Sequence, residues 1–171
     1  MAEEVKFGDI GKKKNYKKFL NISNDKRDIT IRFIGHQKKL YIYFDTILRR
    51  MLFKEERFFK GKSLSPRIVS FVIDRESDEI KAFACPITSF EQMEEYSSDH
   101  DFQIHKEGEG FETKYIVKSL GPSEATKEQE GMVDATLKVY SLEDIFVKRG
   151  KWEILEAEAE PIESRFDILD I

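Results

Sequence analysis

The residues that decide the fold are 67–93, which read RIVSFVIDRESDEIKAFACPITSFEQM. Residues 67–73 are rich in β-branched and aromatic side chains, which predicts a buried strand. The polar residues at 74–78 indicate a turn, after which the chain returns as the second strand of a hairpin. A helix is predicted at residues 86–97, because Pro86 stands at its start and apolar side chains recur at helical spacing. The centre of the predicted fold is therefore a hairpin followed by one amphipathic helix.

Further strands are predicted on both sides of this unit. Apolar and polar side chains alternate over residues 28–36 and again over residues 39–44, so each run predicts a half-buried strand, with a turn at 36–38 between them. Residues 102–106 and 111–118 predict a second hairpin. Strands, then one helix, then strands again is the chain order of an OB-fold. We therefore predict an all-β fold with one or two helices, built as a five-stranded OB-fold barrel.

Two segments have a less regular pattern. Residues 46–59 carry apolar side chains at both helical and strand spacing, so the pattern fits a helix and a strand equally well there. Residues 121–131 are rich in the residues of loops and predict a connection. A short terminal helix is predicted at residues 134–148, where apolar side chains again recur at helical spacing.

The charge is distributed very unevenly along the chain, although the formal net charge is only −4. Residues 1–70 carry 18 Lys and Arg against 8 Asp and Glu, whereas residues 152–171 carry 1 against 7. The basic half predicts an anionic partner, and the acidic end predicts a separate role. The expected parts are a basic N-terminal arm at residues 1–18, an OB-fold DNA-binding domain at residues 19–150 and an acidic C-terminal tail at residues 151–171.

Cysteine and histidine are too sparse to suggest a disulfide or a zinc site. Cys85 is the single cysteine and there are three histidines, with no spacing typical of metal ligands. We expect no metal, no cofactor, and a reducing, cytoplasmic setting. Residues 1–4 lack a signal pattern, and no run approaches the roughly 18 apolar residues of a membrane span, so no membrane association is expected.

The strongest functional signal is the mixture of cations and aromatic rings. Single-strand binders need both, because phosphates attract cations and unpaired bases stack on flat rings. A position in the core stays open for Phe53, Phe58 and Phe59, which lie among these cations. The candidate DNA-binding residues of this kind are Lys12, Lys13, Lys14, Tyr16, Lys39, Tyr41, Tyr43, Arg49, Arg50, Arg57, Lys60 and Lys62.

The C-terminal tail combines acidic and apolar side chains. Its acids could compete with DNA for the basic groove, and its last apolar residues could dock into a pocket of a partner protein. The alternative is that the tail only keeps the chain soluble. The candidate partner-binding residues are Phe166, Asp167, Ile168, Leu169, Asp170 and Ile171.

Several short motifs resemble the phage single-stranded-DNA-binding replication proteins. They are RIVSFVIDR at 67–75, DFQIHK at 101–106, GEGFETKY at 108–115, Gly121-Pro122, and the basic opening KKKNY at 12–16. The resemblance covers about residues 12–122. It implies an OB-fold, sequence-independent binding of single-stranded DNA in replication, recombination or repair, and a tail that contacts replication or recombination proteins.

The resemblance also suggests residues of the binding groove. These are Arg32, Tyr41, Tyr43, Lys114 and Tyr115. Tyr115 would lie on the same face of its strand as Val117, so a position in the core is the alternative for it. Many relatives carry a Cys/His zinc site between the second and third strands. Residues 45–66 contain neither Cys nor His, so no metal-dependent feature is carried over.

The pattern favours a protein that binds single strands and is not an enzyme. Two other functions are alternatives. The first is a phage structural or accessory protein that uses a β-barrel for protein–protein interaction. The second is a metal-dependent nuclease, because Asp74, Glu79 and Lys81 mimic an Asp…Glu-x-Lys motif. The intervening turn favours a charged hairpin tip at these residues instead. The sequence leaves open whether the chain forms homo-oligomers.

Overall fold

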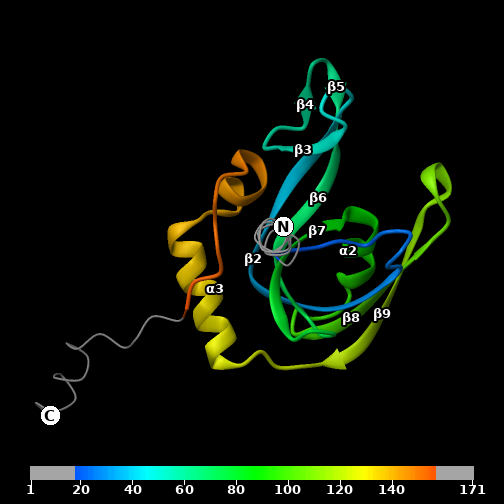
Figure 1. Cartoon of the computed structure of the whole chain (residues 1–171). Coiled ribbons are helices and arrows are strands. Elements are labelled where there is room, and N and C mark those ends of the chain that lie inside the picture. The colour runs from blue at the N-terminus through cyan, green and yellow to red at the C-terminus, as the bar shows by residue number, and fades with distance from the viewer. Residues whose placement is uncertain (1–17, 157–171) are drawn as a thin grey trace, which may run out of the picture.

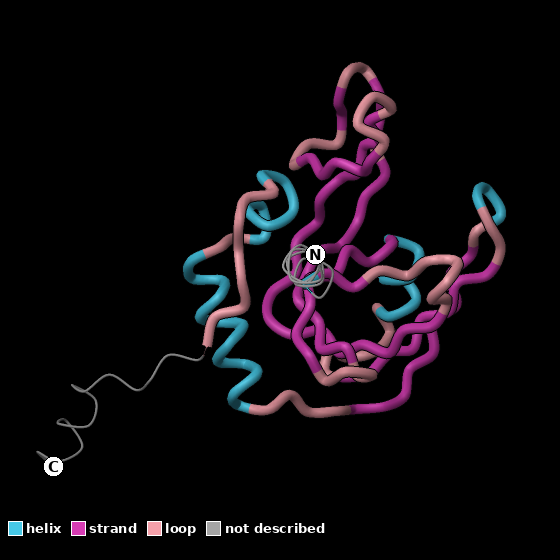
Figure 2. The backbone as a smooth tube through the Cα atoms, viewed as in Figure 1, coloured by secondary structure: helices cyan, strands magenta, loops and turns pink. Residues whose placement is uncertain are grey.

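The computed structural model describes residues 18–156, which form a strand-rich fold with few helices, as predicted (Figures 1 and 2). The helices are α2 (Ile87–Met93) and α3 (Lys127–Val139), with a 3-10 turn at Gly110–Glu112 and a π-helical turn at Asp144–Lys148. The strands are β1 (Phe19–Leu20), β2 (Asp28–Asp45), β3 (Arg50–Lys54), β4 (Phe58–Phe59), β5 (Lys62–Ser63), β6 (Ser65–Asp74), β7 (Glu79–Pro86), β8 (His100–Glu107) and β9 (Lys114–Pro122).

One strongly curved sheet contains most of the strands, in the order β1-β7-β6-β2-β8-β9, with β3 also paired to β2. The long strand β2 makes this possible, because its first part pairs with β8 and its last part pairs with β3. The edges of the path, β1 and β9, are not paired with each other within residues 18–156. Strand pairing there does not close the sheet into a barrel.

The turn predicted at residues 36–38 is wrong, because β2 runs through this segment as one strand. An irregularity in its pairing with β6 lies between Ile34 and Lys38, where Gly35 adopts a φ of +81°. A Cβ at position 35 would lie 2.8 Å from Cγ1 of Val133, which belongs to α3. The bulge therefore bends the strand and lets α3 approach its backbone closely.

The hairpin predicted from residue 67 is confirmed, and the helix predicted at residues 86–97 is present but shorter, since α2 spans Ile87–Met93. Strands β6 and β7 pair in antiparallel register, and α2 begins directly after Pro86. Gln92 of α2 also satisfies the backbone of β9: its Nε2 donates to the carbonyl of Tyr115 at 2.9 Å, and its Oε1 accepts from the amide of Val117 at 3.0 Å. A helical side chain thus covers part of the free edge of β9.

The core has two parts, one on each face of β6, which explains why this strand is apolar throughout. Phe71 belongs to the part beneath α3 and the C-terminal segment, and Val72 belongs to the part beneath α2. Trp152 is only 6% exposed and packs in the first part, although the sequence pattern assigns it to the acidic tail. Residues 157–171 lie outside the described residues.

The terminal helix predicted at residues 134–148 is wrong in its position. Helix α3 begins at Lys127, because Thr126 and Gln129 form a capping box in which each side chain accepts from the backbone amide of the other. The helix ends at Val139, and Tyr140 is extended. The π-helical turn then begins near Ser141 and Asp144, whose side chains and amides bond reciprocally.

Within residues 18–156, neither helix has the length and the apolar character needed to cross a membrane.

Candidate nucleic-acid interface

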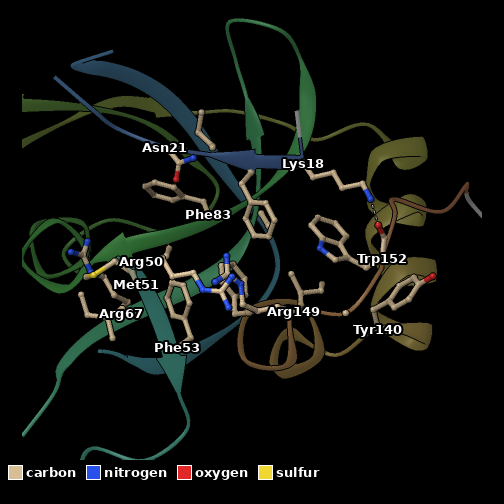
Figure 3. A pocket seen from close by; sticks show the side chains of 18 of the residues that line it. Lys18, Asn21, Arg50, Met51, Phe53, Arg67, Phe83, Tyr140, Arg149 and Trp152 are labelled. Carbon is tan, nitrogen blue, oxygen red and sulfur yellow. Dashed lines mark hydrogen bonds between the residues drawn. The ribbon is translucent and has the colours of Figure 1, made fainter. Parts of the chain in front are cut away.

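A groove of about 1240 Å³ lies where four segments of the chain meet (Figure 3). Residues 18–22, which include β1, form one wall, and residues 82–86 of β7 lie beside them. Residues 50–53 of β3 contribute the opposite wall, and the C-terminal segment at residues 140–153 closes one end. The groove is larger than the roughly 300–1,000 Å³ of a site for a small molecule, so it suits an extended ligand.

The charge of this groove is strongly positive. Its lining contains five cations, Lys18, Arg50, Arg67, Arg149 and Lys151, against the single acid Glu153. Four of the five cations make no ion pair or side-chain hydrogen bond within residues 18–156, and only Lys18 donates to a backbone carbonyl, that of Trp152. An anionic ligand would therefore meet cations that are not already neutralised.

Arg50 and Arg149 lie close together in the groove although they come from distant parts of the sequence (Figure 3). Burial lowers the pKa of Arg149 from its usual value, and the positive charge of Arg50 lowers it further. Arg149 follows the π-helical turn with a φ of 53°, a left-handed conformation that ends the turn. The pair is a concentration of positive charge.

The apolar wall of the groove consists of interlocked aromatic rings. The ring of Phe19 meets that of Phe146 at 5.8 Å and that of Trp152 at 5.4 Å, in both cases edge to face. Phe53 meets Phe146 at 5.1 Å. Because these rings pack against one another, they fix the wall and belong to the core rather than to a free stacking surface.

A second basic and aromatic surface extends from the same end of the molecule. Residues 41–66, which we call the projection, comprise the end of β2, strands β3 to β5 and the start of β6 (Figure 1). The projection carries six Lys and Arg against three Asp and Glu. It also exposes large apolar side chains, among them Phe58 at 64% and Phe44 at 52%. It therefore offers both cations and rings to solvent.

Cations lie over the rings of the projection. The Lys54 ammonium is 4.2 Å from the centre of the Phe59 ring, and the Lys60 ammonium is 5.4 Å from the same ring. Tyr43 packs against Phe59 with 4.9 Å between ring centres, and the Arg57 guanidinium lies 5.7 Å from the Phe58 ring. Cations placed beside half-exposed rings are suited to a ligand with both phosphates and bases.

The residues predicted from the sequence are brought together only in part. Arg50 and Tyr115 line the groove, and Tyr43, Arg57 and Lys60 share the projection with the exposed Arg49 and Lys62. Tyr41, which is half-buried, also belongs to the projection. The others lie apart: Lys39 is exposed on β2, Lys114 is exposed on β9, and Arg32 donates to the carbonyls of Phe33 and Ser123. Lys12, Lys13, Lys14, Tyr16 and residues 166–171 lie outside the described residues.

Four cations of the groove were not predicted, namely Lys18, Arg67, Arg149 and Lys151. The last two lie in VKRGKW at residues 147–152, which has the same mixture of basic and aromatic residues that identified the other candidates. That signal could have found them. Arg67 opens an apolar strand, and nothing in the local pattern distinguishes it.

Two residues of the nuclease-like motif, Asp74 and Lys81, form a structural ion pair. The ammonium of Lys81 lies 2.6 Å from Oδ2 of Asp74, whose side chain is only 1% exposed. Burial alone would raise the pKa of Asp74, but hydrogen bonds from Lys81 and from the amide of Glu76, with the charge of Lys81, hold it below its usual value. Within residues 18–156, no three His, Cys, Asp or Glu side chains are grouped to hold a metal ion.

No protein-family model, curated protein or solved structure matches the chain. The function is therefore argued from the groove and the projection themselves.

Proposed function

We propose that this protein binds single-stranded DNA without sequence preference and is not an enzyme. The observation that carries this proposal is the convergence of Arg50, Arg67, Arg149 and Lys151 in one groove without anionic partners among residues 18–156. Cations without partners are costly to bring together unless an anion joins them. A polyphosphate backbone supplies several negative charges at regular spacing, which suits a groove lined by several cations.

The projection favours a single strand over a duplex. Phe58 presents an exposed ring beside Arg57, and the ring faces of stacked bases are accessible only when the bases are unpaired. Each stacked base can contribute roughly 1–3 kcal/mol of binding free energy. Phosphates held in the groove and bases stacked on the projection would act together, because the two surfaces meet at β3.

We further propose that the strand arrangement is of the OB type. Strands β7-β6-β2-β8-β9 follow one another in the sheet, and α2 is inserted after β7, the third strand of this set. These two features agree with the order expected for an OB-fold. The resemblance to phage replication proteins extends the proposal to a role in replication, recombination or repair, with the tail at residues 166–171 recruiting protein partners.

A fluorescence titration of the full-length chain tests this function. Labelled oligo-dT and a duplex of equal length are titrated at two salt concentrations. We expect tight binding of oligo-dT that weakens steeply as salt rises, with weaker binding of the duplex. Absence of oligo-dT binding at low salt would contradict the proposal. A comparison chain without the tail should end after Glu156, because ending it near Gly150 removes Trp152 from the core.

A second candidate function is protein–protein interaction, and the apolar surface of the projection favours it. Ile47 is 91% exposed, and Leu48 and Phe44 are about half exposed beside it. Exposed apolar side chains grouped at one tip are typical of an interface. The titration separates the two functions, since a chain that binds only protein would show no salt-dependent affinity for oligo-dT.

A further inference from the structure

We propose that Arg50 and Arg149 together clamp one phosphate of the bound strand and thereby tie the base of the projection to the C-terminal segment. This inference rests on the proposed function and specifies how its groove holds the ligand. It goes beyond a general positive surface, because it assigns one anion to two particular guanidinium groups from segments far apart in the sequence.

The acid that lies opposite Arg50 in the strand register is already engaged. Asp45 is paired with Arg50 in the register of β2 and β3. Its Oδ1, however, accepts from the amides of Ile47 and Leu48, both at 2.9 Å, and so closes the turn between the strands. One oxygen of the carboxylate is therefore held by the backbone, and Arg50 makes no ion pair within residues 18–156.

The two acids at the start of the π-helical turn that precedes Arg149 are engaged with other cations. Asp144 lies 3.1 Å from the ammonium of Lys148 and accepts from the amide of Ser141. Glu143 pairs with Lys38 of β2. The acids of the π-helical turn thus neutralise other cations, and Arg149 faces the groove with its charge uncompensated by any described residue.

Two guanidinium groups that line one groove without anionic partners among residues 18–156 repel each other, and an anion between them would reduce this repulsion. Burial lowers the pKa of Arg149, and the positive charge of Arg50 lowers it further, so each of them disfavours the charged form. A phosphate diester has two non-bridging oxygens, and a guanidinium can donate two parallel N–H bonds to such a group. One phosphate between the two side chains would satisfy both.

The site suits the phosphate of a strand better than a free anion. The groove of about 1240 Å³ continues from the pair toward Arg67 in one direction and toward Lys18 in the other. A chain ligand can occupy this length with one phosphate at the pair and its neighbours near the remaining cations. An isolated phosphate would use only the clamp.

The test is a double-mutant cycle in the full-length chain with labelled oligo-dT. We expect Arg50→Gln and Arg149→Gln each to weaken binding about tenfold. The double variant should be no weaker than about the worse single variant, because the phosphate is lost once either side chain is gone. In each of these variants, the slope of log affinity against log salt should be smaller in magnitude by about 0.7, which is the value for one phosphate contact on a single strand.

The matched control is Lys148→Gln, which removes one charge from the residue next to Arg149. Lys148 is exposed and already paired with Asp144, so its loss should change affinity less than twofold. Multiplicative losses in the double variant, about a hundredfold, would overturn the clamp and indicate two independent contacts. Unchanged affinity in either single variant would also overturn it.

A second readout separates failure of the clamp from failure of the proposed function. Thermal unfolding is followed with pyrophosphate or with chloride at equal ionic strength. We expect pyrophosphate to raise the Tm of the unmodified chain and of Lys148→Gln but not of Arg149→Gln. If the chain does not bind oligo-dT, the proposed function fails while this shift still tests the clamp; an equal shift in all variants would contradict the clamp itself.

Discussion

Two regions of the molecule differ in whether their cations are paired with acids. At the turn between β6 and β7, Lys81 lies 2.6 Å from Asp74 and Arg75 lies 3.0 Å from Asp101. At the groove, Arg50 and Arg149 have no anionic partner within residues 18–156. The first region uses its cations to hold strands together, and the second leaves them available. The state of pairing, rather than the number of charges, distinguishes structural cations from those that could bind a ligand.

The paired region also shows how much structure one cation can organise. Arg75 bonds Asp101 of β8 and donates to the hydroxyl of Ser123 and the carbonyl of Glu124. The hydroxyl of Ser123 in turn donates to Asp101 at 2.6 Å. This network connects the turn after β6 with β8 and with the segment that leads to α3. Among the described residues, nothing comparable restrains the guanidiniums of the groove.

The largest effect is expected from breaking the buried pair. Lys81→Met leaves the carboxylate of Asp74 buried without its partner, so the free energy of unfolding should fall by about 3–5 kcal/mol. Urea unfolding measures this loss. Arg67→Gln, which removes a cation of the groove, serves as the control and should change stability by less than about 0.5 kcal/mol. Equal stability of the two variants would contradict the distinction between the regions.

The next effect concerns the rings of the projection. Phe58→Ala should weaken binding of oligo-dT by about 1–3 kcal/mol, because it removes one stacking surface, while stability should hardly change at an exposed position. Phe111→Ala is the matched control, since Phe111 is fully exposed on the turn between β8 and β9. If both variants bind equally well, the projection does not stack bases.

A smaller effect is expected from single cations of the groove outside the clamp. Arg67→Gln should lower the affinity for oligo-dT severalfold and reduce the salt slope by about 0.7. The comparison is Lys26→Gln, because Lys26 is paired with Glu76 at 3.0 Å and lies outside the groove. Titrations at three salt concentrations provide both quantities. An equal loss in the two variants would show that only net charge matters.

The smallest effect is a dependence of stability on acid. The pKa of Asp74 in the folded protein is below its usual value of 3.8, so the unfolded chain takes up the proton first as the pH falls. The stabilisation is therefore complete above the usual value and is lost as the pH falls through the folded value. Urea unfolding of the unmodified chain between pH 5 and pH 2.5, beside Asp74→Asn, should show a steeper loss in the unmodified chain. Parallel curves would contradict this role of Asp74.

The sequence predicts the fold best where local patterns and long-range packing agree. The hairpin of β6 and β7 is apolar throughout because both faces of β6 are buried, and Pro86 marks the start of α2. The pattern fails at residues 36–38, where polar residues suggest a turn but β2 continues through a bulge. The close packing of Val133 against Gly35 favours the bulge over a turn, and Val133 is about a hundred positions away in the sequence.

The candidate site could be predicted only in part, for a similar reason. Interleaved cations and rings identify the projection, because Tyr43, Arg57 and Lys60 are close in both sequence and space. The groove joins residues from both ends of the described chain, such as Lys18 and Arg149. No local pattern indicates that Asp45 and Asp144 contact other groups. The lack of an anionic partner for Arg50 and Arg149 among residues 18–156 is therefore evident only in the three-dimensional structure.

Photo-cross-linking of the full-length chain to oligo-dT, followed by identification of the cross-linked peptides, tests the central claim most directly. We predict cross-links within residues 41–66 and 140–153, which carry the projection and the end of the groove, and their loss at high salt. Cross-links concentrated instead at residues 74–81 and 100–107, where the cations are paired, would contradict the claim. Cross-links no more abundant than with duplex DNA would contradict it equally.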